Sequence, residues 1–196
     1  MRKIFLFVFI ILVQFFSMTA YADLKPALQE ANEKFTYSGK PIHPGLIQEF
    51  SSWISDSGEP TTISVDVAAN HRNEYFEDDM KIRDNGVIVL QKEGEQEYFY
   101  YKWLGRLNNG LHVLSVGEGG GGSGVFQDLF FVRFDIGNGF TSEGERYERL
   151  LMTIVRSFIL GDRDDAEIKV LPDQVVIGKS QYRDDPVIIK ADEMKE

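Results

Sequence analysis

The chain has 196 residues, of which 31 are acidic and 21 basic, giving a formal net charge of -10 at pH 7, and it contains no cysteine. The missing cysteines exclude a disulfide framework, a thiolate metal site and a lipoprotein attachment point. The acidic balance argues against nucleic acid or an anionic membrane as a partner, because binding to phosphate groups depends on Lys and Arg displacing counterions.

The first 22 residues have the composition of a cleavable secretory signal. Arg2 and Lys3 form a basic start, residues 4–13 are apolar, and small residues at 20 and 22 precede Asp23. The apolar run is shorter than the roughly 20 residues that cross a bilayer. We therefore expect residues 1–22 to be removed, which leaves a periplasmic or secreted protein with no stable membrane anchor.

Residues 23–60 have the pattern of a helical N-terminal part. Asp23 can cap a helix that continues to Lys34. After Pro44, apolar side chains recur at the three- and four-residue spacing of an amphipathic helix. These side chains are Leu46, Ile47, Phe50, Trp53 and Ile54. The pattern predicts one or two helices before residue 61.

From Thr61 onward the pattern changes to strands. Asn85-Gly86 is the strongest short hairpin signal, because both residues accept the positive φ of a type I′ turn. Further β-branched and aromatic runs alternate with turn residues along the rest of the chain. The expected strands are 61–67, 80–83, 87–90, 98–107, 111–116, 125–136, 167–171, 174–177 and 187–190. Residues 191–196 are expected to form a polar tail.

Residues 148–160 fit two different structures. Their apolar side chains recur at helical spacing and Gly161 is placed as a C-terminal stop. Thr153, Ile154 and Val155 favour a strand, and consecutive apolar residues also describe a strand that is buried on both faces. The expected antiparallel strands on either side favour the strand.

These elements predict a mainly β, α+β fold, either an antiparallel β-sandwich or a curled barrel, with one or two N-terminal helices. Residues 23–196 are long enough for a single domain whose core needs no covalent cross-link. In this domain residues 23–60 supply the helices and residues 61–190 the antiparallel strands.

The aromatic run over residues 98–103 is the leading candidate for a recognition surface. On a strand, Tyr98 and Tyr100 share one face, whereas Trp103 points to the other. One face must be in the core, and the other is either exposed or covered by a second layer. Exposed aromatic side chains can stack on sugar rings or anchor a protein. Tyr98, Tyr100 and Trp103 are therefore candidate ligand-binding residues.

Loop residues supply the other ligand-binding candidates. His71 and Arg72 lie in a polar segment, and loops carry function more often than strands do. Gly119 and Ser123 belong to a glycine run whose backbone amides can bind a small anion or allow close approach of a partner. The run leads into an expected strand, unlike a dinucleotide-binding fingerprint, and Val125 replaces a glycine of the hydrolase nucleophile elbow.

Asp162, Asp164 and Asp165 are the candidate metal ligands. Alternate acidic residues resemble the opening of a calcium loop, because a hard divalent ion takes several oxygen ligands from a tight turn. Ala166 stands where the third ligand is required, and the distant Glu of an EF-hand is missing. We expect a solvated acidic turn, and calcium is the one cofactor for which the sequence offers a candidate site.

The sequence indicates no nucleophile, complete metal shell or cofactor loop, so we favour a noncatalytic role. His112 lies between Leu111 and Val113 in an expected strand, which predicts a partly exposed position rather than a catalytic base. The leading hypothesis is an exported binding protein that recognises another envelope or secreted protein. The alternatives are a carbohydrate-binding module that uses the aromatic strand face, and a secreted hydrolase that uses paired acids such as Asp79 and Asp164. The expected partner is thus a protein or a glycan.

Overall fold

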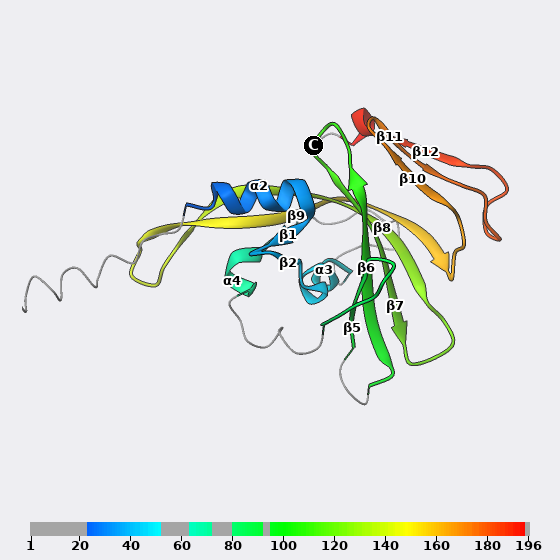
Figure 1. The fold of residues 1–196 in the computed structure, drawn as a ribbon, viewed down its shortest axis with the longest axis horizontal. Coiled ribbons are helices and arrows are strands. Elements are labelled where there is room, and N and C mark those ends of the chain that lie inside the picture. The colour runs from blue at the N-terminus through cyan, green and yellow to red at the C-terminus, as the bar shows by residue number, and fades with distance from the viewer. Residues whose placement is uncertain (1–22, 52–62, 72–79, 92–94, 195–196) are drawn as a thin grey trace, which may run out of the picture.

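The computed structural model describes residues 23–51, 63–71, 80–91 and 95–194. Over these ranges the fold is mainly β and of the α+β class, with a seven-stranded antiparallel sheet that curls into a half-barrel (Figure 1). The strand order of this sheet is β3-β9-β8-β7-β6-β5-β4. The strands are β3 (Ser64–Asp66), β4 (Met80–Ile82), β5 (Val87–Leu90), β6 (Glu97–Arg106), β7 (His112–Gly120), β8 (Phe126–Phe140) and β9 (Arg146–Asp162).

A smaller antiparallel sheet of three strands follows in the chain, in the order β10-β11-β12. Its strands are β10 (Ile168–Leu171), β11 (Gln174–Ile177) and β12 (Val187–Lys190). The N-terminal part contains a short hairpin of β1 (Thr36–Tyr37) and β2 (Lys40–Pro41). The helices are α2 (Lys25–Lys34), α3 (Pro44–Ser51), α4 (Val67–His71) and the 3-10 turn η2 (Ala191–Glu193).

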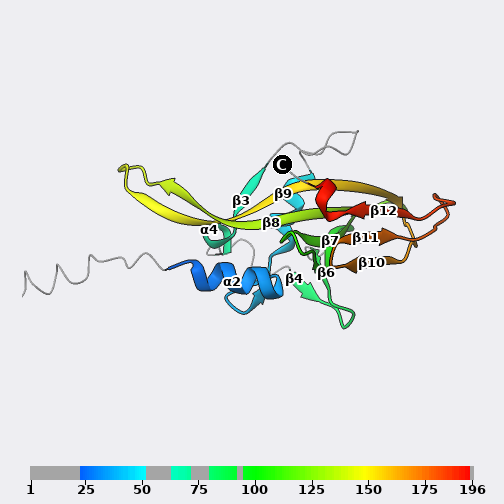
Figure 2. The same cartoon turned by 90° about the horizontal axis from the view of Figure 1, so that it is seen from above.

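Helices α2 and α3 cover one face of the large sheet, as Figure 2 shows for α2. Phe35, which ends α2 in a left-handed conformation, packs edge-on against Tyr101 with 5.8 Å between ring centroids. The Tyr101 ring is buried, and its hydroxyl donates a 2.6 Å hydrogen bond to the Ile42 carbonyl, so the buried polar group has a partner. Each such buried aromatic side chain contributes about 1.5–3 kcal/mol to folding. Phe35 and Tyr101 belong to the cluster of buried side chains between the helices and this face of the large sheet, which we call the first core.

The opposite face of the large sheet has a second core at one end, beneath the three-stranded sheet. Leu129 and Phe131 of β8 are fully buried there against Val175 and Ile177 of β11. The last residues of the described chain add to this core, because Met194 is also buried in it. Tyr98 and Tyr100 point to the same side of the sheet but belong to neither core.

Several expected elements are confirmed. Residues 148–160 form the middle of strand β9, and the Asn85-Gly86 turn joins β4 to β5 with Gly86 at φ 78°. The glycine run ends β7 and leads into strand β8. Trp53 and Ile54, which were expected to continue the second helix, lie outside the described residues.

The expected strand over 61–67 is shorter than the sequence indicates. β3 ends at Asp66, and α4 begins at Val67, which is buried in the first core. The Asp66 side chain accepts a 3.3 Å hydrogen bond from the Ala69 amide, so it caps the helix that replaces the end of the strand. Within the described ranges, no helix has the length and apolar composition needed to cross a membrane.

Candidate functional site

The candidate site is built on Tyr98 and Tyr100, which we call the tyrosine ledge. Both rings project from β6 on the face opposite α2 and α3, and both are partly exposed. Their ring centroids are 6.3 Å apart and their planes differ by 20°. Because they are two residues apart on one strand, they share a face and form a continuous aromatic surface.

Glycines of the next strand lie beneath the two rings. Tyr98 pairs with Gly119 and Tyr100 pairs with Gly117 across β6 and β7. A Cβ added at Gly119 would lie 2.5 Å from Cε1 of Tyr98, and a Cβ added at Gly117 would overlap Tyr100. The rings thus cover positions where a side chain cannot fit, an arrangement that holds aromatic rings against a sheet. Gly117 and Gly119 are required by this packing.

A hollow of about 440 Å³ lies beside the tyrosine ledge. Its size falls within the range of small-ligand pockets. The residues that line it come from β5, β6, β8 and the segments that flank β4 and β9. They are Arg83, Val87, Tyr98, Tyr100, Val125, Gln127, Arg163 and Asp164.

Gln127 and Tyr100 form the polar floor of the hollow. The Gln127 side-chain amide donates a 2.8 Å hydrogen bond to the Tyr100 hydroxyl oxygen. Burial raises the pKa of Tyr100, so the phenol stays neutral at physiological pH and its proton is available for donation. Gln127 Oε1 is buried and has no hydrogen-bond partner among the residues that the structure describes. The floor therefore has a spare donor, the Tyr100 O–H, whereas the unpaired acceptor Gln127 Oε1 is enclosed.

Two basic side chains line the hollow around this floor, and a third lies on the same face of the sheet. Arg83 and Arg163 line the hollow from two different segments. Lys102 pairs with Val87 across β5 and β6, and paired residues share a face, so Lys102 projects on the same side as the ledge. The charged residues that line the hollow are Arg83, Arg163 and Asp164. Arg163 is paired with Asp162 and Asp164 with Arg183, which leaves Arg83 as the lining cation without an ion pair among the described residues.

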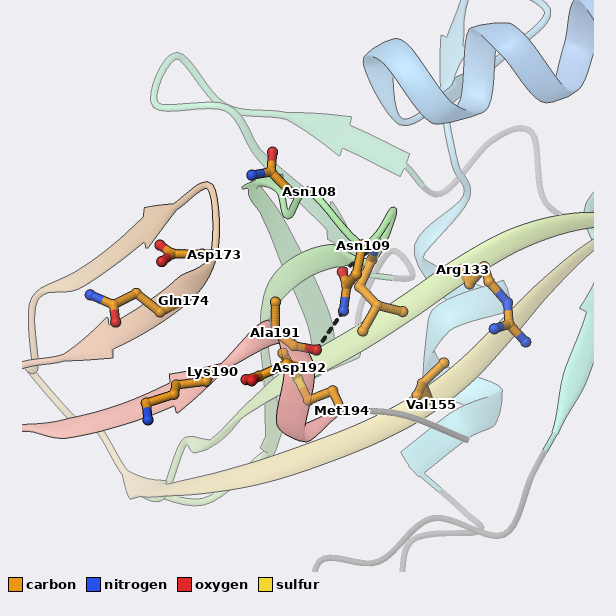
Figure 3. A pocket seen from close by; sticks show the side chains of 11 residues that line it. Asn108, Asn109, Arg133, Val155, Asp173, Gln174, Lys190, Ala191, Asp192 and Met194 are labelled. Atoms are coloured by element: carbon orange, nitrogen blue, oxygen red, sulfur yellow. Dashed lines mark hydrogen bonds between the residues drawn. The ribbon is translucent and has the colours of Figure 1, made fainter.

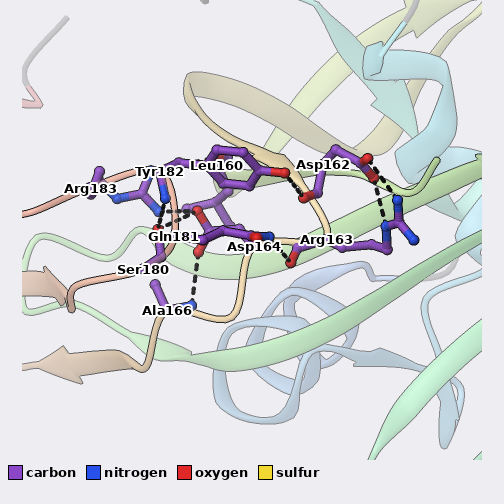
Figure 4. A network of polar contacts seen from close by, with 9 residues as sticks. All are labelled: Leu160, Asp162, Arg163, Asp164, Ala166, Ser180, Gln181, Tyr182 and Arg183. Atoms are coloured by element: carbon purple, nitrogen blue, oxygen red, sulfur yellow. Dashed lines mark hydrogen bonds and ion pairs between the residues drawn. The ribbon is translucent and has the colours of Figure 1, made fainter.

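The acidic turn after β9 is held by arginines and backbone amides (Figure 4). Asp164, whose side chain is 1% exposed, forms an ion pair with Arg183 and accepts hydrogen bonds from the Ala166 amide and the Ser180 hydroxyl. Asp162 accepts a 2.7 Å hydrogen bond from the Val125 amide and pairs with Arg163. These contacts fasten the end of β9 to the loop before β12.

The structure offers no metal shell at the predicted calcium ligands. Asp162 and Asp164 have cationic partners, and Asp165 is exposed. In the described part of the chain, no group of three or more His, Asp or Glu side chains is arranged to hold a metal ion. Asp164 instead contributes to the hollow beside Arg163.

The other predicted ligand-binding residues do not join the tyrosine ledge. Trp103 points to the helix-covered face, where it stacks on Phe35 at 6.4 Å, and its indole N–H donates to the Gly105 carbonyl. His71 ends α4 and Arg72 lies outside the described residues. Ser123 is exposed in the loop between β7 and β8. The structure thus brings Tyr98, Tyr100 and Gly119 together and places Trp103 elsewhere.

His112 also differs from the expectation of a partly exposed position, because it is fully buried. Its ring lies among Phe35, Trp103 and Phe134 with centroid distances of 5.3, 6.1 and 5.3 Å. Burial and the nearby Arg106 lower the pKa of His112 to about 4. The residue therefore packs as a neutral aromatic ring beneath α2.

A larger hollow, of about 730 Å³, lies between the two sheets (Figure 3). Arg133 and Val155 line it from the large sheet, and Asp173 and Lys190 from the small one. The Asn109 side-chain amide donates a 2.8 Å hydrogen bond to the Ala191 carbonyl at its wall. Its charges are of both signs and none of the predicted site residues lines it, so it defines no ligand class.

Sequence reasoning missed Arg83, Gln127 and Arg163. Each is separated from the aromatic run by at least one strand or turn, so only the strand register brings it to the ledge. The one sequence signal for this site was the alternation of Tyr98 and Tyr100 with apolar residues expected to be buried, and it gave the position of the ledge but not these three residues. Comparison with protein-family models, with curated proteins and with solved structures finds no match to this chain.

Proposed function

We propose that the protein is an exported, noncatalytic binding protein that takes up its ligand at the tyrosine ledge. The observation that carries this proposal is the pair of near-parallel tyrosine rings, 6.3 Å apart, beside a hollow of about 440 Å³. Aromatic side chains offer a large contact area with few rotatable bonds to freeze, which makes them effective anchors for a ligand.

The ledge is packed against the sheet and held by a hydrogen bond without any ligand. Gly117 and Gly119 support the rings from below, and Gln127 holds the Tyr100 hydroxyl. A site that is already ordered avoids the entropy loss of immobilising side chains on binding. Such preorganisation supports a recognition surface.

The carboxylates near the hollow support binding more than acid catalysis. Asp164 is the one carboxylate among the described residues that line it, and it is paired with Arg183. Glycoside hydrolysis needs two carboxylates on either side of the scissile bond. Asp79, the other acid considered for a hydrolase, lies outside the described residues.

The volume of the hollow, about 440 Å³, is large enough for a sugar unit, which makes a glycan the second candidate beside a protein partner. A carbohydrate-binding function, in which a sugar ring packs on Tyr98 and Tyr100, therefore has a specific observation in its favour.

A binding comparison with fractionated envelope extract tests the proposal. The variants are Tyr98→Ala/Tyr100→Ala, which removes the ledge, and Tyr147→Ala, whose ring also covers a glycine, Gly139, but on the distant β8–β9 hairpin. We expect the wild type and Tyr147→Ala to retain a component that the double variant loses. Equal retention by all three proteins, or turnover on a hydrolase panel, would contradict the proposal.

A further inference from the structure

Arg163 is held in an unusual backbone conformation at the edge of the hollow. Its φ is 52°, in the left-handed region that residues other than glycine rarely adopt. The Arg163 amide donates a 2.8 Å hydrogen bond to the Val125 carbonyl, and the Gln181 side chain donates to the Arg163 carbonyl at 3.3 Å. Such conformations persist where surrounding contacts impose them, and they are frequent at binding sites.

The Arg163 side chain is also fixed in place. Its Nε and Nη2 both donate to Asp162 at 3.2 Å, and Asp162 is anchored in turn by the Val125 amide. This ion pair orients the guanidinium at the hollow and leaves Nη1 available. A guanidinium with free N–H groups in fixed orientation suits a carboxylate ligand.

Arg83 supplies a second cation on the other side of the hollow. Its backbone is fixed at the β4–β5 turn, where the Arg83 amide donates a 2.9 Å hydrogen bond to the Val87 carbonyl. The side chain is exposed and, within the described residues, forms no ion pair. Its positive charge acts on Tyr100, whose pKa it lowers against the larger effect of burial. An anionic group in the hollow would thus meet the unpaired Arg83 guanidinium and the free Nη1 of Arg163, while the Asp162 and Asp164 carboxylates are each held by an arginine.

The backbone beneath the ledge excludes one mode of peptide recognition. β6 and β7 are inner strands, and each is hydrogen-bonded to a neighbour on both sides over the ledge. An extended peptide therefore cannot add here as a further strand, the mode in which main-chain hydrogen bonds supply affinity. Recognition must use side chains, and those that line the hollow are two tyrosine rings, two valines, a carboxamide, two guanidinium groups and the Asp164 carboxylate that Arg183 neutralises.

We infer that the ledge binds an acidic saccharide, a sugar chain that carries a carboxylate on at least one ring. A pyranose ring packs on Tyr98 and Tyr100, one of its hydroxyls accepts the Tyr100 O–H that Gln127 holds in place, and its carboxylate pairs with Arg83 and with Nη1 of Arg163. This inference rests on the proposed function, since it names the ligand class of the same site.

Calorimetric titration with a panel of uronic acid trisaccharides tests the inference, with the methyl ester of each as the uncharged match. We expect at least one acid form to bind, its methyl ester to bind at least tenfold more weakly, and Arg83→Gln or Arg163→Gln to lose at least tenfold in affinity for the acid form. Arg146→Gln, at the hairpin end of β9 where Arg146 pairs with Phe140, is the matched control and keeps wild-type affinity. Circular dichroism checks that each variant is folded.

The alternative outcomes separate the two proposals. If acid and ester forms bind equally and both depend on Tyr98 and Tyr100, the inference that the ligand must carry a carboxylate is wrong. The proposal that the ledge is a binding site would still stand. If a Glu-rich peptide binds as tightly as the best saccharide, or if no saccharide of the panel binds, the inference that the ligand is a saccharide is wrong. Binding that is unchanged in Tyr98→Ala/Tyr100→Ala contradicts both proposals.

Discussion

The ring of Tyr100 lies directly over Gly117 on the neighbouring strand, so the ledge and the glycine run of β7 form one structural unit. A methyl group at Gly117 would occupy the space of the Tyr100 ring. Gly117 and Gly119, the first two glycines of the run, are thus explained by packing on one face of the sheet.

Gly117→Ala is predicted to destabilise the protein by about 1–3 kcal/mol, because overpacking displaces the ring. The matched control is Gly120→Ala, where an added Cβ meets nothing within 4 Å. Urea denaturation of both variants measures the difference. The Gly117→Ala/Tyr100→Ala double variant should recover part of the loss, and a Gly117→Ala variant as stable as Gly120→Ala would show that the ring does not rest on the glycine.

Asp164→Asn is predicted to destabilise the protein by about 3 kcal/mol or more, because it leaves the Arg183 guanidinium without its partner in a nearly buried position. Asp165→Asn, one residue away and exposed, should change stability by no more than about 0.5 kcal/mol. Chemical denaturation of the two variants provides the measurement. Equal stabilities would contradict the structural role of Asp164, and so would calcium-dependent stability of the wild type that Asp164→Asn abolishes.

His112 is predicted to make the protein less stable as the pH falls. Its pKa in the folded state is about 4, against 6.5 for the free group. Between these values the unfolded chain binds a proton that the native chain does not, so acidification favours unfolding, with a full effect of about 3 kcal/mol. The free energies of unfolding of the wild type and of His112→Gln are measured from pH 7 to pH 4. The difference between them should shrink by this amount as the pH falls. Parallel curves would contradict it.

Asp128 is predicted to act in the opposite direction. Burial, together with the charge of Glu118, raises the pKa of Asp128 from 3.8 to about 6. The native chain then keeps a proton that the unfolded chain releases, so this group stabilises the fold below pH 3.8 and loses that effect as the pH rises through 6. Asp128→Asn should therefore raise stability at pH 7, by about 1 kcal/mol after allowance for solvent screening at this half-buried position.

The control for Asp128 is Glu118→Gln, which removes the neighbouring charge but keeps the hydrogen-bonding shape. It should lower the pKa of Asp128 toward its ordinary value while leaving the burial effect in place. NMR titration of the Asp128 carboxyl group measures both values. An unshifted Asp128 in the wild type would contradict the prediction.

Local pattern determined much of the secondary structure. The Asn85-Gly86 turn and the opposite faces of Tyr100 and Trp103 depend on residues close in sequence, and both appear in the structure. The strand over 148–160 also appears, but its local pattern fitted a helix equally and the neighbouring strands favoured a strand. The end of β3 at Asp66 did not follow from local preference, because burial of Val67 in the first core and the Asp66 cap favoured a helix. Short β-branched segments give way to tertiary packing of this kind.

What the sequence by itself determined is therefore the class of fold, the alternation along each strand and the overall acidic charge. Only the tertiary structure decided which aromatic face is covered by helices, and that Arg83, Gln127 and Arg163 meet beside the tyrosine ledge. The physical reason is that alternation is a property of one strand, whereas a site on a sheet depends on register between strands. A shift of one residue in that register would turn every side chain of a strand to the other face.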